Sequence, residues 1–85
     1  MARDYTYQET RQRLLQSLRS RFGHTEMIDQ TQAAHLYGYK DVGKAKAQLA
    51  QLPAYEFGRQ KVRYALTDIA SDLARRARYP NSHVF

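Results

Sequence analysis

Residues 29–52 read DQTQAAHLYGYKDVGKAKAQLAQL, and this stretch decides which fold the chain is expected to adopt. Asp29 is a suitable N-cap for a short helix that we expect over residues 30–37. After a turn that contains glycine, Asp41 is a second cap and predicts another helix over residues 42–51. Two helices joined by a turn of about three or four residues form a helix-turn-helix arrangement.

The next stretch alternates aromatic or β-branched residues with polar ones, which is typical of short strands. The alternating positions, which we expect to pack in a two-stranded hairpin, are Tyr55, Phe57, Val62 and Tyr64. The connection Gly58-Arg59-Gln60-Lys61 opens on glycine and is expected to be the hairpin loop.

Helices are expected on both sides of this region. Thr6 and Glu9 form the S/T-x-x-E pattern of a capping box, which predicts a helix over residues 7–22. After the hairpin, Thr67 is expected to cap a last helix that runs from Asp68 to about Arg78.

These elements predict a mainly α domain with a small β-hairpin, that is, a winged helix-turn-helix with an additional N-terminal helix. The domain is expected to span residues 1–79, followed by a flexible tail over residues 80–85. Its core is expected to use the apolar side chains that recur at helix or strand spacing. These are Leu14, Leu18, Phe22, Ile28, Ala34, Leu36, Val42, Leu49, Leu52, Phe57, Val62, Tyr64, Ile69 and Leu73.

The charge of the chain points to a partner. Lysine and arginine number 14 against 8 acidic residues, a net charge of +6. Residues 1–42 hold six basic and five acidic side chains, whereas residues 43–85 hold eight and three. A basic field concentrated in one half favours a polyanion as partner. The alternative is a solvated basic surface that binds nothing.

One face of the expected helix over residues 42–51 suits the major groove of DNA. Lys44, Gln48 and Gln51 fall on the face opposite its apolar stripe and are predicted to read bases. Lysine can donate to guanine, and glutamine can bond adenine through two hydrogen bonds. The alternative is an ordinary solvated helix face.

The hairpin adds long cationic side chains next to that helix. Arg59, Gln60 and Lys61 are expected at its tip and Arg63 on its outward side, where they would reach phosphates or a minor groove. Lys40 and Lys46 are expected to contact the DNA backbone as well.

Several kinds of function are not expected. The chain has no cysteine, which excludes disulfides, thiolate metal sites and cysteine nucleophiles. Its three histidines lack metal-ligand spacing, and Asp68 and Asp72 fit helix caps or dipole partners better than acid–base catalysts. We therefore expect a protein that is not an enzyme and uses no metal or cofactor. Without a long apolar run or a recognisable signal peptide, we expect no membrane partner and a cytoplasmic location.

Residues 27–76 resemble the small winged-helix proteins of phages and mobile elements. The likeness rests on the pair Ala33-Ala34, on Leu52-Pro53, on the Gly-Arg wing and on Leu66-Thr67-Asp68-Ile69. It includes excisionases, AlpA-like regulators, the MerR-type fold and, more loosely, pyocin-activator-type regulators. Gln32 replaces the glutamate usual before the alanine pair, and the first helix is longer than excisionases carry.

The residues and the resemblance together imply sequence-specific binding of double-stranded DNA, in transcriptional regulation or as an excisionase. The further partners implied are a second copy of the chain, in a dimer or a cooperative array, and an integrase or another phage or host protein. The alternative is a phage-encoded inhibitor or adaptor that binds protein through helix 7–22. That helix is rich in arginine, with Arg11, Arg13, Arg19 and Arg21.

Overall fold

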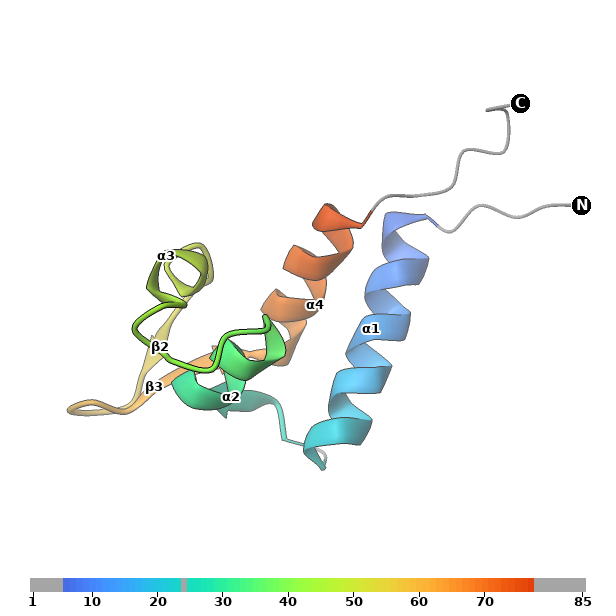
Figure 1. The fold of residues 1–85 in the computed structure, drawn as a ribbon. Coiled ribbons are helices and arrows are strands. Elements are labelled where there is room, and N and C mark those ends of the chain that lie inside the picture. The colour runs from blue at the N-terminus through green and yellow to red at the C-terminus, as the bar shows by residue number, and fades with distance from the viewer. Residues whose placement is uncertain (1–5, 24, 78–85) are drawn as a thin grey trace, which may run out of the picture.

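A computed structural model describes residues 6–23 and 25–77, which form four α-helices and a small antiparallel sheet (Figure 1). The elements are α1 (Tyr7–Phe22), β1 (Met27–Asp29), α2 (Gln30–Leu36), α3 (Lys46–Leu49), β2 (Tyr55–Glu56), β3 (Val62–Ala65) and α4 (Leu66–Arg76). The expectation of a mainly helical chain with a little β-structure is confirmed. The expected tail over residues 80–85 lies outside the described residues.

The capping box predicted for the first helix is present. The Glu9 N–H donates to Thr6 Oγ1 and the Thr6 N–H donates to Glu9 Oε1, each over 3.1 Å. At the other end Gly23 takes a left-handed conformation, with φ +68°. Both ends of α1 are therefore determined by local residue chemistry, as the sequence predicts.

The second helix also has a cap at each end. Asp29 Oδ1 accepts the N–H of Gln32 over 2.8 Å, and Gln32 Oε1 accepts the N–H of Asp29 over 3.1 Å. Beyond the helix, Gly38 has φ +89° and the Tyr39 N–H returns to the carbonyl of Ala34. This return is a Schellman motif, which favours glycine because of the positive φ.

The third helix is shorter than predicted, and the 42–51 range is wrong. Residues 42–45 form turns, because Asp41 Oδ1 accepts the N–H of Gly43 over 2.8 Å. After α3, the Gln51 N–H bonds the carbonyl three residues before it, at Gln48. Side-chain capping at one end and tight turning at the other restrict regular helix to Lys46–Leu49.

The sheet contains a strand that the sequence analysis did not predict. Its order is β1-β3-β2, with β3 antiparallel to both neighbours. Ile28 on β1 lies opposite Tyr64, and Glu56 on β2 lies opposite Val62. The hairpin is thus part of a three-stranded sheet whose first strand is too short to show a periodicity.

The last helix begins at Leu66, and the prediction that Thr67 caps it is wrong. The extended residue before the helix is Ala65, whose side chain cannot cap. The free N–H of Leu66 instead donates to the carbonyl of Glu26 over 2.9 Å. Because the segment before β1 supplies this acceptor, β3 continues directly into α4.

The core lies where α1 runs antiparallel beside α4 and where α2 packs on the sheet and on α3 (Figure 1). Most of the predicted core residues are buried or pack against buried ones. Phe57 is the exception, with 61% of its surface exposed, and Tyr55 is 39% exposed. Both lie on or beside β2, an edge strand of two residues whose side chains the helices do not cover.

Candidate nucleic-acid interface

Two elements project on the side of the molecule away from α1. Figure 1 shows α3 and the β2–β3 hairpin at the left, with α1 at the far right. Beside α3 an open cleft of about 390 Å³ is lined by residues of α3 and its flanking turns, by Gln30 of α2 and by Tyr64 of β3. The lining residues are Gln30, Val42, Gly43, Lys46, Leu49, Ala50 and Tyr64.

Five exposed cations lie on these two elements and on the turn that leads into α3. They are Lys40, Lys44, Lys46, Arg59 and Lys61, and we call this set the basic end. None of their side chains forms a hydrogen bond or an ion pair with another described residue. Residues 40–63 hold six cations and two acids, so 6 − 2 = 4 of the six net charges lie there.

The hairpin loop presents two of its side chains at the tip. The Phe57 N–H donates to the carbonyl of Lys61 over 2.9 Å, and the Lys61 N–H donates to that of Gly58 over 3.2 Å. Arg59 and Gln60 are therefore the central residues of a β-turn. Gln60 has φ +61°, a backbone conformation that residues other than glycine, asparagine and aspartate seldom adopt. The predicted four-residue loop is confirmed.

The sequence predicts that Arg63 projects from the outward side of the hairpin, and the structure shows that its side chain is partly covered. It is half-buried on β3, opposite Asp29 on one side and Tyr55 on the other. Its Nη1 donates to the carbonyl of Val62 over 3.0 Å. The central position of β3 explains the difference, because both neighbouring strands cover its side chain in part.

Gln48 is buried, so the prediction that its side chain lies on the exposed face of the helix is wrong. Only 9% of its surface is exposed, and its Nε2 has no partner among the described residues. Together with Ala45, Leu49 and Leu52 it forms the buried face of α3 and the turn after it. These four positions have the spacing i, i+3, i+4 and i+7 of a single helix face.

The other two predicted base-reading residues differ from each other. Gln51 is exposed, but its Oε1 accepts a hydrogen bond from Arg76 Nη2 over 2.9 Å. Bidentate donation and acceptance toward adenine would require that bond to break. Lys44 lies in the turn before α3, exposed and without a partner among the described residues. The structure therefore does not bring the three side chains together as one reading face.

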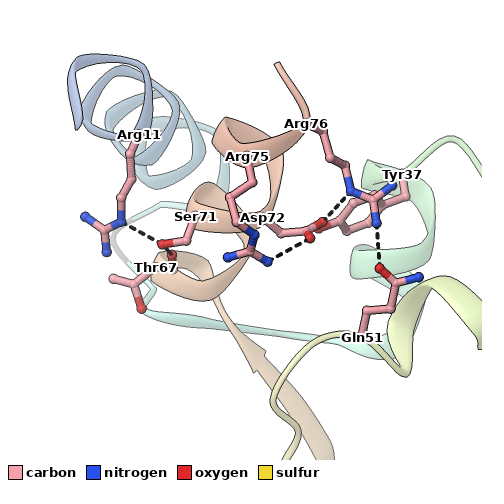
Figure 2. Close-up of polar contacts among 8 residues, drawn as sticks. All are labelled: Arg11, Tyr37, Gln51, Thr67, Ser71, Asp72, Arg75 and Arg76. Carbon is pink, nitrogen blue, oxygen red and sulfur yellow. Dashed lines mark hydrogen bonds and ion pairs between the residues drawn. The ribbon is translucent and has the colours of Figure 1, made fainter. Parts of the chain in front are cut away.

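A buried carboxylate joins the α2–α3 region to α4 (Figure 2). Asp72 is 3% exposed, and its Oδ2 accepts the hydroxyl of Tyr37 over 2.8 Å and Arg76 Nε over 3.0 Å. Its Oδ1 accepts Arg75 Nη2 over 3.1 Å. Because Arg76 also bonds Gln51, one cluster joins the end of α2, the segment after α3 and the last turns of α4.

This cluster changes the acidity of its tyrosine. Burial raises the pKa of Tyr37, and the hydrogen bond to the negatively charged Asp72 raises that pKa further. A buried carboxylate needs such partners, since an unpaired charge in the interior is strongly destabilising.

The sequence analysis missed this cluster by treating Asp72 as a dipole partner near a helix terminus. The spacing of Asp72 to Arg75 and Arg76 could have predicted ion pairs. Nothing local could have predicted that Tyr37, 35 positions earlier, donates to the same carboxylate. Asp68 likewise is not a cap, and it accepts the hydroxyl of Tyr55 over 3.2 Å.

No group of three or more residues that could hold a metal ion occurs within residues 6–23 and 25–77. Over the same residues, no helix has the length and apolar character needed to cross a bilayer.

Comparison with known proteins does not place the chain in a family. No protein-family model, no curated protein and no solved structure matches it. Its function therefore has to be inferred from its own residues.

Proposed function

We propose that this chain binds double-stranded DNA through the basic end. The observation that carries the proposal is the set of five exposed cations that have no acidic partner among the described residues. Holding like charges together without counter-charges is unfavourable in an isolated protein, and a phosphate backbone would neutralise them.

The arrangement of elements supports assignment to the winged helix-turn-helix class. Helices α2 and α3 follow each other across a turn, and the β2–β3 hairpin comes directly after them. In the proposed complex, Lys46 of α3 and Lys44 of the turn before it face the major groove, while the hairpin reaches the backbone or the minor groove. The roles implied are those of the resemblance, a transcriptional regulator or an excisionase.

The proposed contacts differ in kind. Lys40, Lys46, Arg59 and Lys61 are placed to meet phosphates, which position a protein on DNA without reading its sequence. Lys44 is the one predicted base-reading residue that is both exposed and unbonded within the described residues. Gln60, exposed at the tip of the hairpin, would meet the minor groove or the backbone together with Arg59.

The protein-binding alternative has less support. It rests on the arginines of α1, and these arginines are engaged inside the chain. Arg11 Nε donates to Ser71 Oγ over 2.7 Å, and Arg19 forms an ion pair with Glu26 over 3.0 Å. Arg21 lies 5.6 Å from the centre of the Phe22 ring. These contacts explain much of the arginine content of α1 without a partner.

The test is affinity for duplex DNA across a salt series, measured by fluorescence anisotropy. Four phosphate contacts predict a slope of about −3.6 in log affinity against log salt concentration, at about −0.9 per contact. The double variant K46Q/K61Q removes two of these contacts and is expected to bind more weakly and to reduce the slope by about two units.

The matched control is R19Q/R21Q, which removes the same charge from α1. It is expected to leave affinity nearly unchanged apart from a small long-range effect. Equal weakening by both double variants would mean that only net charge matters and that the basic end is not the interface. Absence of binding at low salt would refute the DNA proposal itself.

A further inference from the structure

The hairpin carries an exposed aromatic ring among cations. Phe57 has 61% of its surface exposed, more than Tyr55 or Tyr39, the other large apolar side chains found exposed in the described residues. A single exposed apolar residue is common on protein surfaces and by itself indicates no function. Phe57 differs because cationic residues of the same hairpin lie near it in the chain.

The register of the hairpin defines those surroundings. Tyr55 pairs with Arg63. The hydrogen bond from the Phe57 N–H to the Lys61 carbonyl shows that Phe57 and Lys61 are the last pair before the turn. Because side chains alternate between the two faces of a strand, Tyr55, Phe57, Lys61 and Arg63 lie on one face of the hairpin. Glu56, the acid of this hairpin, lies on the other face.

The two aromatic side chains on this face, Tyr55 and Phe57, differ in their contacts. The hydroxyl of Tyr55 donates to Asp68 on the first turn of α4, which ties this ring to the body of the protein. Phe57 has no polar group to engage and lies one step nearer the tip. It is therefore the apolar side chain that a surface approaching the hairpin would meet first.

We propose that Phe57 is a wedge that enters the minor groove, separates two stacked base pairs and bends the duplex. Proteins that bend DNA from the minor groove use exposed apolar side chains in this way, with cations nearby to hold the phosphates. Lys61 lies opposite Phe57 in the hairpin and Arg59 lies in the turn two residues beyond it, and these two residues supply the cations. The net charge of residues 55–63 is 3 − 1 = +2, which favours a polyanion over an apolar protein surface as the occupant.

This inference rests on the proposed DNA binding, and its test separates the two. A duplex of about 30 base pairs with a central TA step, an easily unstacked step, is labelled at its ends with a donor and an acceptor fluorophore. Energy transfer between the ends reports bending, while anisotropy of the same duplex reports binding.

The wild-type chain is expected to increase energy transfer on binding. F57A is expected to bind with no more than about tenfold weaker affinity and to abolish that increase. F57L, which keeps an apolar wedge, is expected to restore most of it. The control Y39A removes another exposed aromatic ring outside the hairpin and is expected to bend the duplex as the wild type does. Because Phe57 is exposed, unchanged thermal unfolding of F57A is expected to accompany these results.

Binding without any bend, or an equal bend by the wild type and F57A, would overturn the wedge and leave DNA binding intact. A loss of self-association in F57A with an unchanged bend would also overturn it and would make Phe57 a contact between copies. Failure of the wild-type chain to bind the duplex at low salt would instead refute the proposed function.

Discussion

The amide of Gln48 lies on the buried face of α3, among positions that hold Ala45, Leu49 and Leu52. An apolar side chain would suit this position, because a buried N–H group without a partner loses its hydrogen bonds to water and gains none. Its burial also removes it from the surface that would meet DNA. Stability and recognition at this residue can therefore be separated by one substitution.

Gln48→Leu is expected to raise the free energy of unfolding by about 1–3 kcal/mol, the usual penalty of an unsatisfied buried polar group. DNA affinity is expected to stay unchanged. The measurement is the midpoint of urea unfolding at constant slope. Gln51→Leu is the matched control at an exposed glutamine and is expected to bring no gain. A destabilised Q48L would indicate that the amide has a partner, such as a buried water, that the leucine cannot replace.

Tyr37 and Asp72 illustrate how a polar contact across the chain affects stability. The pKa of Tyr37 is raised above its ordinary value near 10, because its hydroxyl is buried and donates to a carboxylate. In the unfolded chain tyrosine loses its proton near pH 10, while folded Tyr37 keeps it. The unfolded state then binds fewer protons, so stability falls as pH rises above about 10.

Tyr37→Phe is expected to lower the free energy of unfolding at pH 7 by about 1.5–3 kcal/mol, the range for hydrogen bonds to charged groups. Above pH 10 the difference between the wild type and Y37F is expected to shrink, because only the wild type loses this contribution there. Urea unfolding of both proteins from pH 7 to pH 11 measures this difference. A difference that stays constant across that range would contradict the assigned role of the hydroxyl.

At the scale of the elements, helix starts differ in what satisfies their free N–H groups. Thr6 caps α1 with its own side chain, while the first N–H of α4 is bonded by the carbonyl of Glu26. Thr67 lies inside α4, one residue after the start at Leu66. The same residue type thus has a capping role at one helix and none at the other.

Thr6→Ala is expected to lower the free energy of unfolding by about 1 kcal/mol, as the loss of an N-cap does. Thr67→Ala is expected to change it by no more than about 0.5 kcal/mol, as substitutions without a special structural role usually do. Thermal unfolding of the two variants makes the comparison directly. Equal losses would mean that Thr67 supports the start of α4 after all.

At the scale of the whole molecule, the chain separates charge that is paired from charge that is free. On the side of α1 and α4, arginines bond Ser71, Glu26 and Asp72. On the side of α3 and the hairpin, the basic end has no such partners among the described residues. The first side stabilises the domain, and the second is the side that we propose for DNA.

In so small a chain, few contacts hold the side of α1 and α4 to the side of α3 and the hairpin. A chain of 85 residues buries only about two-thirds of its unfolded surface, so few contacts hold each element. The Asp72 cluster adds polar contacts that join α4 to the end of α2 and to the segment after α3. These contacts therefore help to hold α2 and α3 against the rest of the chain.

The sequence by itself determined the features that depend on residues within about four positions of one another. The capping boxes at Thr6 and Asp29, the end of α2 at Gly38 and the loop Gly58–Lys61 all belong to this group. Helix spacing likewise identified most of the core, including Ala34 of α2 and Leu49 of α3. Local hydrogen bonds and side-chain periodicity carry this information without reference to the rest of the chain.

Only the tertiary structure decided the features that join distant segments. β1 becomes a strand because Ile28 meets Tyr64, and Asp72 is buried because Tyr37 reaches it. Gln48 lies inside and Phe57 outside, against the sequence-based prediction for each. Which face of a short helix or an edge strand is covered depends on the elements that pack against it. Those packing partners lie many residues away, where no local pattern can indicate them.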